Sequence, residues 1–458
     1  MYTDTIAAIA TALSDSGIGI IRISGPEAIA IADKIYRTKS GQQKLIEFES
    51  HTIHYGYIID SASGDILDEV MVSVFKAPKS YTAEDTVEIN CHGGVLLCKR
   101  ILEEVCRAGA RLAEPGEFSK RAFLNGRMDL TEAEAVMDLI HSKNEYALSS
   151  SMKQLRGSVS ELIREMRAEI LHEIAFIESA LDDPEHISLD GYPSSLEEKV
   201  DDLLNRLKKL LKSTAKGRMI QEGINTVIVG KPNAGKSSLL NLLVGEERAI
   251  VTNVAGTTRD VLEESISLRG IHLNIIDTAG IHSTEDVVEK IGVEKAKQYA
   301  ENADLILYVV DASVPLDESD QEIMELIKDK KTVILLNKSD LDAVVKDEDF
   351  SPSAILIRTS AKENIGMEEF EEKVEELFLG GKISFNDQVM ITNLRHKRAL
   401  EDTVESLHLV KKSLEDGMPE DFYSIDLMSA YTSLGTIIGE EVGEDLVNEI
   451  FSKFCMGK

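Results

Sequence analysis

The stretch from Gly230 to Ser237, GKPNAGKS, constrains the fold of this chain more than any other feature. It follows an apolar, strand-like run, NTVIVG, and precedes a helix-like run, SSLLNLL. Its two glycines let the backbone curl so that several N–H groups face one point, and the following helix adds the positive end of its dipole. In this context the pattern G-x-x-x-x-G-K-[ST] predicts a phosphate-binding loop. Lys236 would span two phosphates of a nucleotide, and Ser237 would offer its hydroxyl to Mg²⁺.

Three further motifs follow this loop in order. DTAG, Asp277 to Gly280, ends an apolar run and would bring a carboxylate near the metal ion. NKSD, Asn337 to Asp340, follows KTVILL, and an Asp there accepts hydrogen bonds from both N1–H and the exocyclic amine of guanine. SAK, Ser360 to Lys362, would support the base from a neighbouring loop. The four motifs resemble the signature set of the GTPases and favour GTP over ATP.

The region between the first two motifs departs from Ras-like GTPases. Ile281 follows DTAG, where those proteins keep a glutamine that orients the attacking water. Thr258, in AIVTNVAGTTRD, is the natural switch threonine for Mg²⁺. The small residues before it, together with Asn233, resemble the potassium loop of cation-dependent GTPases, in which oxygen atoms hold K⁺ where an arginine finger would place its charge. A switch loop without a metal ion is the alternative interpretation.

The remaining chain shows distinct sequence patterns. Up to about residue 125, short strand-like runs alternate with two helical runs, which predicts an α+β domain. From Leu155 to Leu181, and again from Ser195, apolar residues recur every three or four positions, as in helices with one buried side. From Ile224 to about Phe378, strand-like runs alternate with helices, which predicts a parallel sheet. A helical pattern then resumes and continues to the tail.

The predicted fold is therefore multidomain, with an N-terminal α+β domain, a helical domain, and an α/β P-loop domain inserted into the helical one. Insertions are tolerated where the two ends of a domain lie close together. The predicted boundaries are 1–125 for the N-terminal domain, 126–222 and 380–458 for the two parts of the helical domain, and 223–379 for the inserted domain. The length of 458 residues fits about three domains.

Composition excludes several other classes. A net charge of -31 argues against nucleic-acid binding through bulk charge, so such contacts would use local patches around Lys99–Arg111, Lys208–Arg218 or Arg395–Arg398, or these patches are solvated helix faces. The four cysteines form no C-x-x-C pair and suggest no zinc site or disulfide framework, which fits a reducing cytoplasm. The N-terminus lacks a basic region, and no window resembles a membrane span.

The segment PGEFSKRAFLNGRMDLTEAEA, Pro115 to Ala135, and the final CMGK are far more specific than the nucleotide motifs. With them, the whole chain resembles the MnmE (TrmE) family of tRNA modification GTPases. The resemblance implies a homodimer formed through the N-terminal domain, which is similar to folate-binding one-carbon domains and holds 5-formyl- or 5,10-methylene-tetrahydrofolate. It also implies G domains that dimerise with K⁺ during hydrolysis. The implied partner is the FAD-binding protein MnmG (GidA), in a heterotetramer or larger complex that adds an aminomethyl or carboxymethylaminomethyl group to carbon 5 of the tRNA wobble uridine.

The resemblance assigns roles to matching positions. Folate would contact Arg22, Glu88, Arg127 and Lys458, with Arg127 standing where many relatives have Lys. Glu289 would orient the attacking water, and Cys455 would be the second catalytic residue. Mg²⁺ would be held by Ser237 and Thr258, and K⁺ by Asn233, Thr252, Val254 and Thr257. The predicted GTP-binding residues are Asn233, Ala234, Gly235, Lys236, Ser237, Ser238, Thr252, Asn253, Val254, Ala255, Gly256, Thr257, Thr258, Asp277, Thr278, Ala279, Gly280, Asn337, Lys338, Asp340, Ser360, Ala361 and Lys362.

Two questions stay open at this level. Cys455, three positions before the predicted folate contact Lys458, would be either a nucleophile or a bystander. The tail itself fits prenylation poorly and would be either docked or frayed. The alternative function is that of a ribosome-assembly switch like Era or Der, with no chemistry on RNA. Those families carry an RNA-binding module or a second G domain, whereas this chain has one P-loop motif followed by helices.

Overall fold

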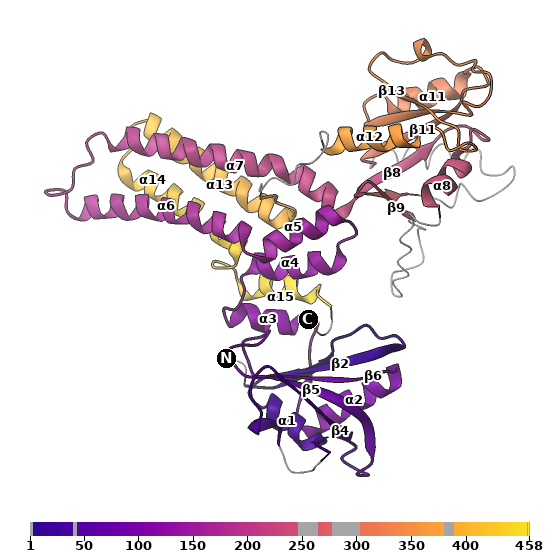
Figure 1. Cartoon of the computed structure of the whole chain (residues 1–458). Helices are drawn as coiled ribbons and strands as arrows, with labels where there is room; N and C mark the ends of the chain where they lie inside the picture. Colours follow the sequence, from indigo (N-terminus) through magenta and orange to yellow (C-terminus); the bar gives the residue numbers. More distant parts are fainter. Residues whose placement is uncertain are drawn as a thin grey trace. The chain divides into compact units, whose positions relative to one another are not determined.

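The computed structural model of the chain describes residues 3–39, 44–245, 264–276, 303–379, 389–455 and 457. By its internal contacts the chain divides into two compact units (Figure 1). The first unit comprises Met1–Met137, Gln154–Val200 and Asp402–Lys458, and the second comprises Asp138–Lys153 and Asp201–Glu401. Each unit is therefore built from segments that lie far apart in the sequence. The domain boundaries given above stay a prediction.

The first unit contains a sheet whose described strands run in the order β3-β4-β5-β6-β2-β1-β7. Their bounds are β1 (Ile6–Ile9), β2 (Ser16–Ser24), β3 (Tyr36–Arg37), β4 (Thr52–Ile59), β5 (Ile66–Phe75), β6 (Thr86–Gly93) and β7 (Arg111–Leu112). All neighbours are antiparallel except β1 and β7. Strands β2, β4, β5 and β6 confirm the predicted strand-like runs. The strands β1, β3 and β7 were not predicted, because a run of two to four residues is too short to show the alternation of apolar and polar residues that marks a strand.

Helices α1 (Ala28–Ile35) and α2 (Val95–Ala108) pack on this sheet. Their apolar residues share one core with the strands, in which Ile31 and Ile101 are buried together with Ile21 and Ile89. Alternate residues of a strand point to opposite faces of the sheet. Arg22 of β2, next to Ile21, therefore points away from this core, and it pairs in register with Glu88 of β6.

Some of the described helices lie within the first unit, and others contain residues of both units. Within the first unit lie α3 (Glu117–Leu124), α6 (Ser158–Asp182), α14 (Glu420–Ile438) and α15 (Glu444–Ser452), with the 3-10 turn η1 (Leu45–Glu47) in the N-terminal region. Residues of both units form α4 (Leu130–His141), α5 (Glu145–Leu155), α7 (Tyr192–Glu222) and α13 (Leu394–Glu415).

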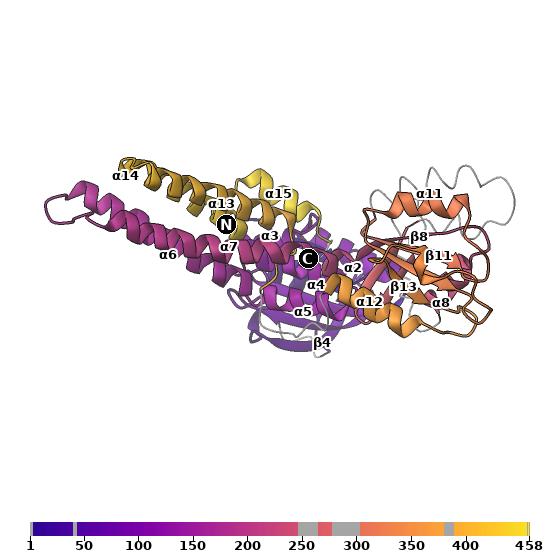
Figure 2. The same cartoon turned by 90° about the horizontal axis from the view of Figure 1, so that it is seen from above.

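Helices α6 and α14 lie side by side in both views (Figures 1 and 2). The predicted stripe of α6 is buried at Val159, Met166, Ile170, Ile174 and Ile177, which confirms the helical pattern. The predicted stripe is wrong at both ends, because Leu155 is the last residue of α5 and Leu181, in the last turn of α6, is 43% exposed. Helix α6 ends at Asp182, two residues before Pro184, because a proline disfavours the helical conformation of the residue that precedes it.

The second unit contains a sheet with the strand order β13-β12-β11-β8-β10-β9 among its described strands. The strands are β8 (Ile224–Val229), β9 (Glu264–Leu268), β10 (Ile271–Ile275), β11 (Leu305–Asp311), β12 (Thr332–Asn337) and β13 (Ile355–Arg358). The other elements of this region are α8 (Lys236–Val244), α11 (Glu318–Ile327), α12 (Met367–Leu379) and the turn η2 (Asp347–Asp349).

The five predicted strands of this sheet pair in parallel, but the sheet as a whole is mixed. Strand β9 pairs antiparallel with β10 through the turn at Arg269 and Gly270. Strand β9 is not among the predicted strands, because the alternation in ESISL is short and weak. Both faces of β11 are buried, since Leu307 and Val309 belong to one core cluster and Ile306 and Tyr308 to another.

Within the part of the chain that the structure describes, no helix is long and apolar enough to cross a membrane.

Candidate functional site

The glycine-rich loop lies between β8 and α8, as predicted. Its backbone takes positive φ angles at Gly230 (148°), Asn233 (63°) and Gly235 (99°). A side chain at Gly230 would collide with the carbonyl of Val309, and one at Gly235 would collide with the amide of Asn337. Both glycines are therefore required by the fold as well as by the curvature of the loop. Helix α8 begins directly after Gly235, so the positive end of its dipole lies at this loop.

The ammonium of Lys236 is held by the loop itself. Its Nζ donates hydrogen bonds to the carbonyl oxygens of Gly230 and Lys231, each at 2.7 Å. Burial lowers the pKa of Lys236 from its ordinary value. Among the described residues this half-buried ammonium contacts neutral acceptors alone, so it is well placed to bind an anion such as a phosphate, which compensates its desolvation. Ser237 and Ser238 follow in the first turn of α8.

Asn337 joins the loop to the segment after β13. Its Nδ2 donates to the carbonyl of Ala234 at 2.9 Å, and its Oδ1 accepts from the N–H of Ala361 at 3.2 Å. The side chain is 3% exposed, so these bonds are shielded from water. Asn337 therefore acts as a brace between the phosphate loop and the SAK segment, a relation that the motifs alone do not specify.

Asp340 and Ser360 form a further contact between the NKSD and SAK motifs. The Ser360 hydroxyl donates to Asp340 Oδ1 at 2.6 Å, and this bond holds the pKa of the exposed Asp340 carboxyl below its usual value. The carboxylate thus stays ionised and able to accept from paired N–H donors. Lys338 binds Asp311 at the end of β11, with 2.5 Å between Nζ and Oδ2. Lys362 is exposed at the surface.

The structure thus brings together the described members of the predicted nucleotide site. They lie at the carboxyl ends of β8, β11, β12 and β13, the edge of a parallel sheet at which ligands bind. The other predicted members lie outside the described residues: Thr252, Asn253, Val254, Ala255, Gly256, Thr257, Thr258, Asp277, Thr278, Ala279, Gly280 and Glu289.

A second group of predicted residues meets in the first unit. Arg22 donates from Nε to Glu88 Oε1 at 2.9 Å and from Nη1 to the carbonyl of Gly457 at 2.9 Å. The guanidinium groups of Arg22 and Arg127 lie 5.2 and 5.0 Å from the ring centre of Tyr81. Arg22 and Arg127 therefore lie at one aromatic ring, and Glu88 pairs with Arg22. Lys458 lies outside the described residues.

Tyr81 is a member of this group that the sequence motifs miss. Its hydroxyl hydrogen-bonds to Ser119 of α3 at 2.8 Å, in addition to its contacts with the two arginines. The sequence SYTAED around it offers no pattern that distinguishes a site residue from a loop residue. The one signal in the sequence is that Tyr81 is an aromatic residue between Arg22 and Glu88, two predicted folate contacts.

The C-terminal tail is docked rather than frayed. Phe451 and Phe454 are buried in a core cluster with Met128. The N–H of Gly116 donates to the carbonyl of Cys455 at 3.4 Å, and Gly457 is buried. The Cys455 side chain is exposed. The tail therefore brings an accessible thiol to within two residues of the carbonyl that Arg22 binds.

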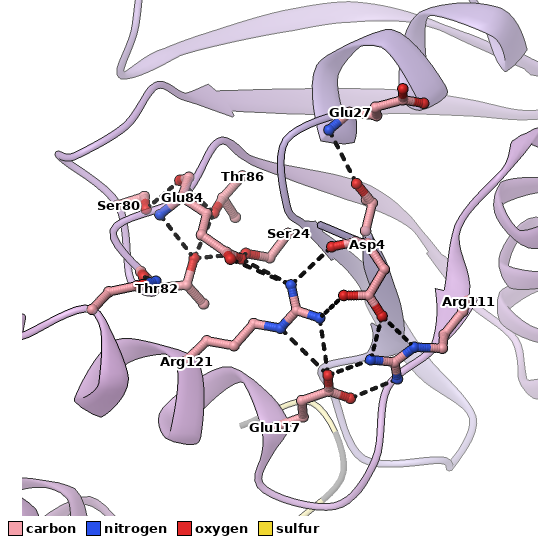
Figure 3. Close-up of polar contacts among 12 residues, drawn as sticks. Asp4, Ser24, Glu27, Ser80, Thr82, Glu84, Thr86, Arg111, Glu117 and Arg121 are labelled. Carbon is pink, nitrogen blue, oxygen red and sulfur yellow. Dashed lines mark hydrogen bonds and ion pairs between the residues drawn. The ribbon is translucent and has the colours of Figure 1, made fainter. Parts of the chain in front are cut away.

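A buried cluster of ion pairs supports the segments around this group (Figure 3). Arg121 of α3 is fully buried and pairs with Asp4 at 2.9 Å, Glu117 at 3.0 Å and Glu84 at 3.3 Å. Burial alone would raise the pKa of Glu117, but hydrogen bonds from Arg111, Glu114 and Arg121 lower it overall. The spacing of Glu117 and Arg121 in PGEFSKRAF, four residues apart on one helix face, is the sequence signal for this pair.

Comparisons with known proteins cover the whole chain. Residues 130–455 match the family model described as MnmE helical domain, and residues 5–127 match that described as GTP-binding protein TrmE N-terminus. A protein of Lachnoclostridium phytofermentans named tRNA modification GTPase MnmE is 57% identical over 460 residues, 100% of each chain. Its namesake in Acetivibrio thermocellus is 48% identical over 458 residues, 99% of each chain. A crystal structure of Aquifex aeolicus Era bound to GDP.AlF4- covers 41% of this chain and 67% of its own, with 28% identity and a TM-score of 0.26.

Proposed function

The chain belongs to the MnmE family of tRNA modification GTPases, and we propose that its GTP hydrolysis drives the modification of carbon 5 of the tRNA wobble uridine. In this proposal the added group is aminomethyl or carboxymethylaminomethyl, and a tetrahydrofolate derivative supplies a carbon unit. The FAD-binding protein MnmG is the partner, and the chain acts in the cytoplasm as a homodimer. The chain is a GTP hydrolase, and the site around Lys236 and Asp340 is the proposed place of GTP binding.

The described residues of the nucleotide site have separable tasks. The Lys236 ammonium and the loop N–H groups bind phosphate oxygens, and Asn337 keeps the loop in its curled form. Asp340, ionised and oriented by Ser360, accepts from the N–H groups of guanine and excludes adenine. Glu289, outside the described residues, is the proposed group that orients the attacking water.

The donor set fits the two proposed cations. Ser237 lies in the first turn of α8 beside Lys236, where its hydroxyl would hold Mg²⁺ together with Thr258; Mg²⁺ would neutralise phosphate charge. Asn233, Thr252, Val254 and Thr257 would hold K⁺ through amide, hydroxyl and carbonyl oxygens. The exposed Asn233 takes a left-handed backbone conformation within the loop, which supports its use as an outer ligand.

The group around Tyr81 fits a reduced folate. It offers one carboxylate, Glu88, for the N–H donors of a pterin ring, and guanidinium groups, Arg22 and Arg127, for its carbonyl or for the carboxylates of a glutamyl tail. The Gly457 carbonyl next to Arg22 supports the proposal that the tail contributes Lys458 and Cys455 to the same site. This convergence of four separate chain segments is the observation that carries the folate part of the proposal.

The test is nucleoside analysis by mass spectrometry of tRNA from a strain that lacks this protein. The expected result is a wobble uridine without the modification. The wild-type gene is expected to restore the modification, and the Lys236→Ala gene is not. Arg22→Ala is expected to hydrolyse GTP normally and yet to leave the uridine unmodified, since Arg22 belongs to the other group. Cys455→Ser distinguishes a nucleophile, whose loss abolishes modification, from a bystander. A normal uridine profile in the deletion strain, with co-sedimentation of the protein with ribosomal subunits, would favour the ribosome-assembly alternative.

The potassium part has its own test. GTP hydrolysis by the whole chain is expected to be faster in K⁺ than in Na⁺ at equal ionic strength, and Asn233→Ala is expected to remove the difference. Equal rates in the two salts would rule out a potassium site while leaving the GTPase assignment intact.

A further inference from the structure

Lys231, the second residue of the glycine-rich loop, makes contacts that phosphate binding alone does not explain. Its Nζ lies 2.9 Å from Asp317 Oδ2 and 2.6 Å from Asp320 Oδ2. Its side chain is 21% exposed. Both acids belong to the start of α11, which is separated from the loop by more than 80 residues of sequence, since the Lys231–Asp317 bond spans 86 residues. The loop is therefore tied to a helix outside the four nucleotide motifs.

The anchor of this contact is buried and fixed. Asp320 is 1% exposed, and its second oxygen accepts from the hydroxyl of the buried Tyr308 in β11 at 2.8 Å. Asp317 caps α11 by accepting from the N–H groups of Ser319 and Asp320, and its own N–H donates to Asp320 Oδ2 at 2.9 Å. A carboxylate so deeply buried requires a cationic or N–H partner, and the rigid capping box prevents it from moving to find another.

The other end of Lys231 reaches the phosphate-binding lysine. The carbonyl oxygen of Lys231 accepts from Lys236 Nζ at 2.7 Å and from the N–H of Ala234 at 3.3 Å. Pro232 follows directly and restricts the backbone of Lys231 to extended conformations. The position of this carbonyl therefore depends on where the Lys231 side chain is anchored.

We infer that Lys231 is a positioning residue for nucleotide binding. Its ion pairs with Asp317 and Asp320, called the clamp below, fix the start of the glycine-rich loop, and the Lys231 carbonyl then orients the Lys236 ammonium toward the phosphates. The hydrogen bonds that Lys231 donates to Asp317 and Asp320 raise its pKa and keep it charged, which supports the clamp. The binding energy of the phosphates depends on this aim, because a charged donor loses strength when its geometry is disturbed.

A purely structural role for Lys231 makes a different prediction, and stability and affinity separate the two. Lys231→Met leaves the Asp320 charge buried without its ammonium, so both roles expect the folded state to be less stable. The double variant Lys231→Met/Asp320→Asn removes both charges and is expected to recover most of the lost stability. With a structural role alone, nucleotide affinity recovers as well; with a positioning role, affinity stays low because the clamp is still absent.

The experiment measures the dissociation constants of fluorescent GDP and GTP analogues for the whole chain, beside urea denaturation. We expect both constants to rise about tenfold in Lys231→Met and in the double variant, an increase equivalent to about 1.4 kcal/mol of lost binding. Lys231→Arg, which keeps the ion pairs, is expected to bind within about twofold of wild type. Lys328→Met is the matched control, because that lysine pairs with Glu325 of α11 at 3.5 Å, with its side chain 66% exposed.

Wild-type affinity in the double variant would overturn the inference, and so would unchanged affinity in a folded Lys231→Met. Weak binding by Lys328→Met would overturn it too, because the effect would then not be specific to the clamp. If Lys231→Met does not fold, the double variant and Lys231→Arg still decide the question.

Discussion

The charged clusters of the two units are arranged in opposite ways. In the N-terminal cluster of Figure 3, Arg121 is fully buried and Glu117 is 4% exposed, and charged groups satisfy one another. In the proposed nucleotide site, the contacts of Lys236 with described residues are to backbone carbonyls, and the surface carboxylate of Asp340 accepts from the Ser360 hydroxyl. The first arrangement leaves little for a ligand to bind. The second holds Lys236 and Asp340 by neutral partners that a ligand can replace.

This difference has an energetic reason. A buried ion pair is costly to break, because the remaining partner keeps its charge in a poorly polarisable interior. A cationic group held by neutral acceptors easily exchanges them for an anionic ligand, which is a stronger partner. Burial and charge compensation together therefore separate groups that stabilise the fold from groups that bind.

The largest expected effect comes from breaking the buried cluster. Arg121→Met leaves Asp4, Glu84 and Glu117 without their central partner and is expected to lower the free energy of unfolding by about 3–5 kcal/mol. Hydrogen exchange of β1 and α3 in the full chain measures the loss locally. Arg358→Met is the control, since that arginine pairs with Asp347 at the surface, with 48% and 64% of the side chains exposed, and about 0–1 kcal/mol is expected. Equal losses in the two variants would refute the distinction.

The tail contact is expected to show a smaller effect. Gly457 has a φ of 89°, and an added Cβ would lie 2.7 Å from the Cα of Ala10. Gly457→Ala is therefore expected to destabilise the docked tail by at least about 1–2 kcal/mol, the cost of a left-handed backbone with a side chain. The measurement is the rate of proteolysis of the tail, together with wobble-uridine modification at an unchanged GTPase rate. Gly443→Ala is the control, because a Cβ there meets no atom within 4 Å. A tail as protected as that of wild type would show that Gly457 does not control docking.

The sequence predicts those parts of the sites that depend on local spacing. GKPNAGKS, NKSD and SAK locate the described part of the proposed nucleotide site, because each motif sits at the end of a strand whose apolar run is recognisable. Arg22, Glu88 and Arg127 were assigned through resemblance, and in the structure the two arginines lie at the ring of Tyr81 while Glu88 pairs with Arg22.

The features that the sequence does not predict depend on which distant segments meet. Tyr81 lies between two arginines because β2 and the start of the helical region converge on it. Lys231 contacts α11 only because β8 and β11 are adjacent in the sheet. Strand β9 is missed for another reason, since five residues with a weak alternation resemble a loop.

A buried histidine tests the rule that buried charges and polar groups find partners. His272 of β10 is 2% exposed, and neither ring nitrogen has a hydrogen-bond partner among the described residues. Burial, with a smaller contribution from the charge of Lys143, lowers the pKa of His272 from 6.5 to about 4. The ring is therefore neutral in the folded state near neutral pH, which makes its burial tolerable.

His272→Phe replaces the unpaired ring by an apolar one, so the free energy of unfolding at neutral pH is expected to change by less than about 1 kcal/mol, the smallest effect of the three. Below the unfolded pKa of 6.5 the unfolded chain takes up a proton that the folded chain refuses until about pH 4, so wild-type stability falls as the pH drops through this window. The variant lacks this loss and is expected to gain stability relative to wild type at about pH 5. Urea denaturation of both proteins at the two pH values measures the difference. Parallel pH profiles would mean that His272 finds a partner in solution, and the rule would then hold without this exception.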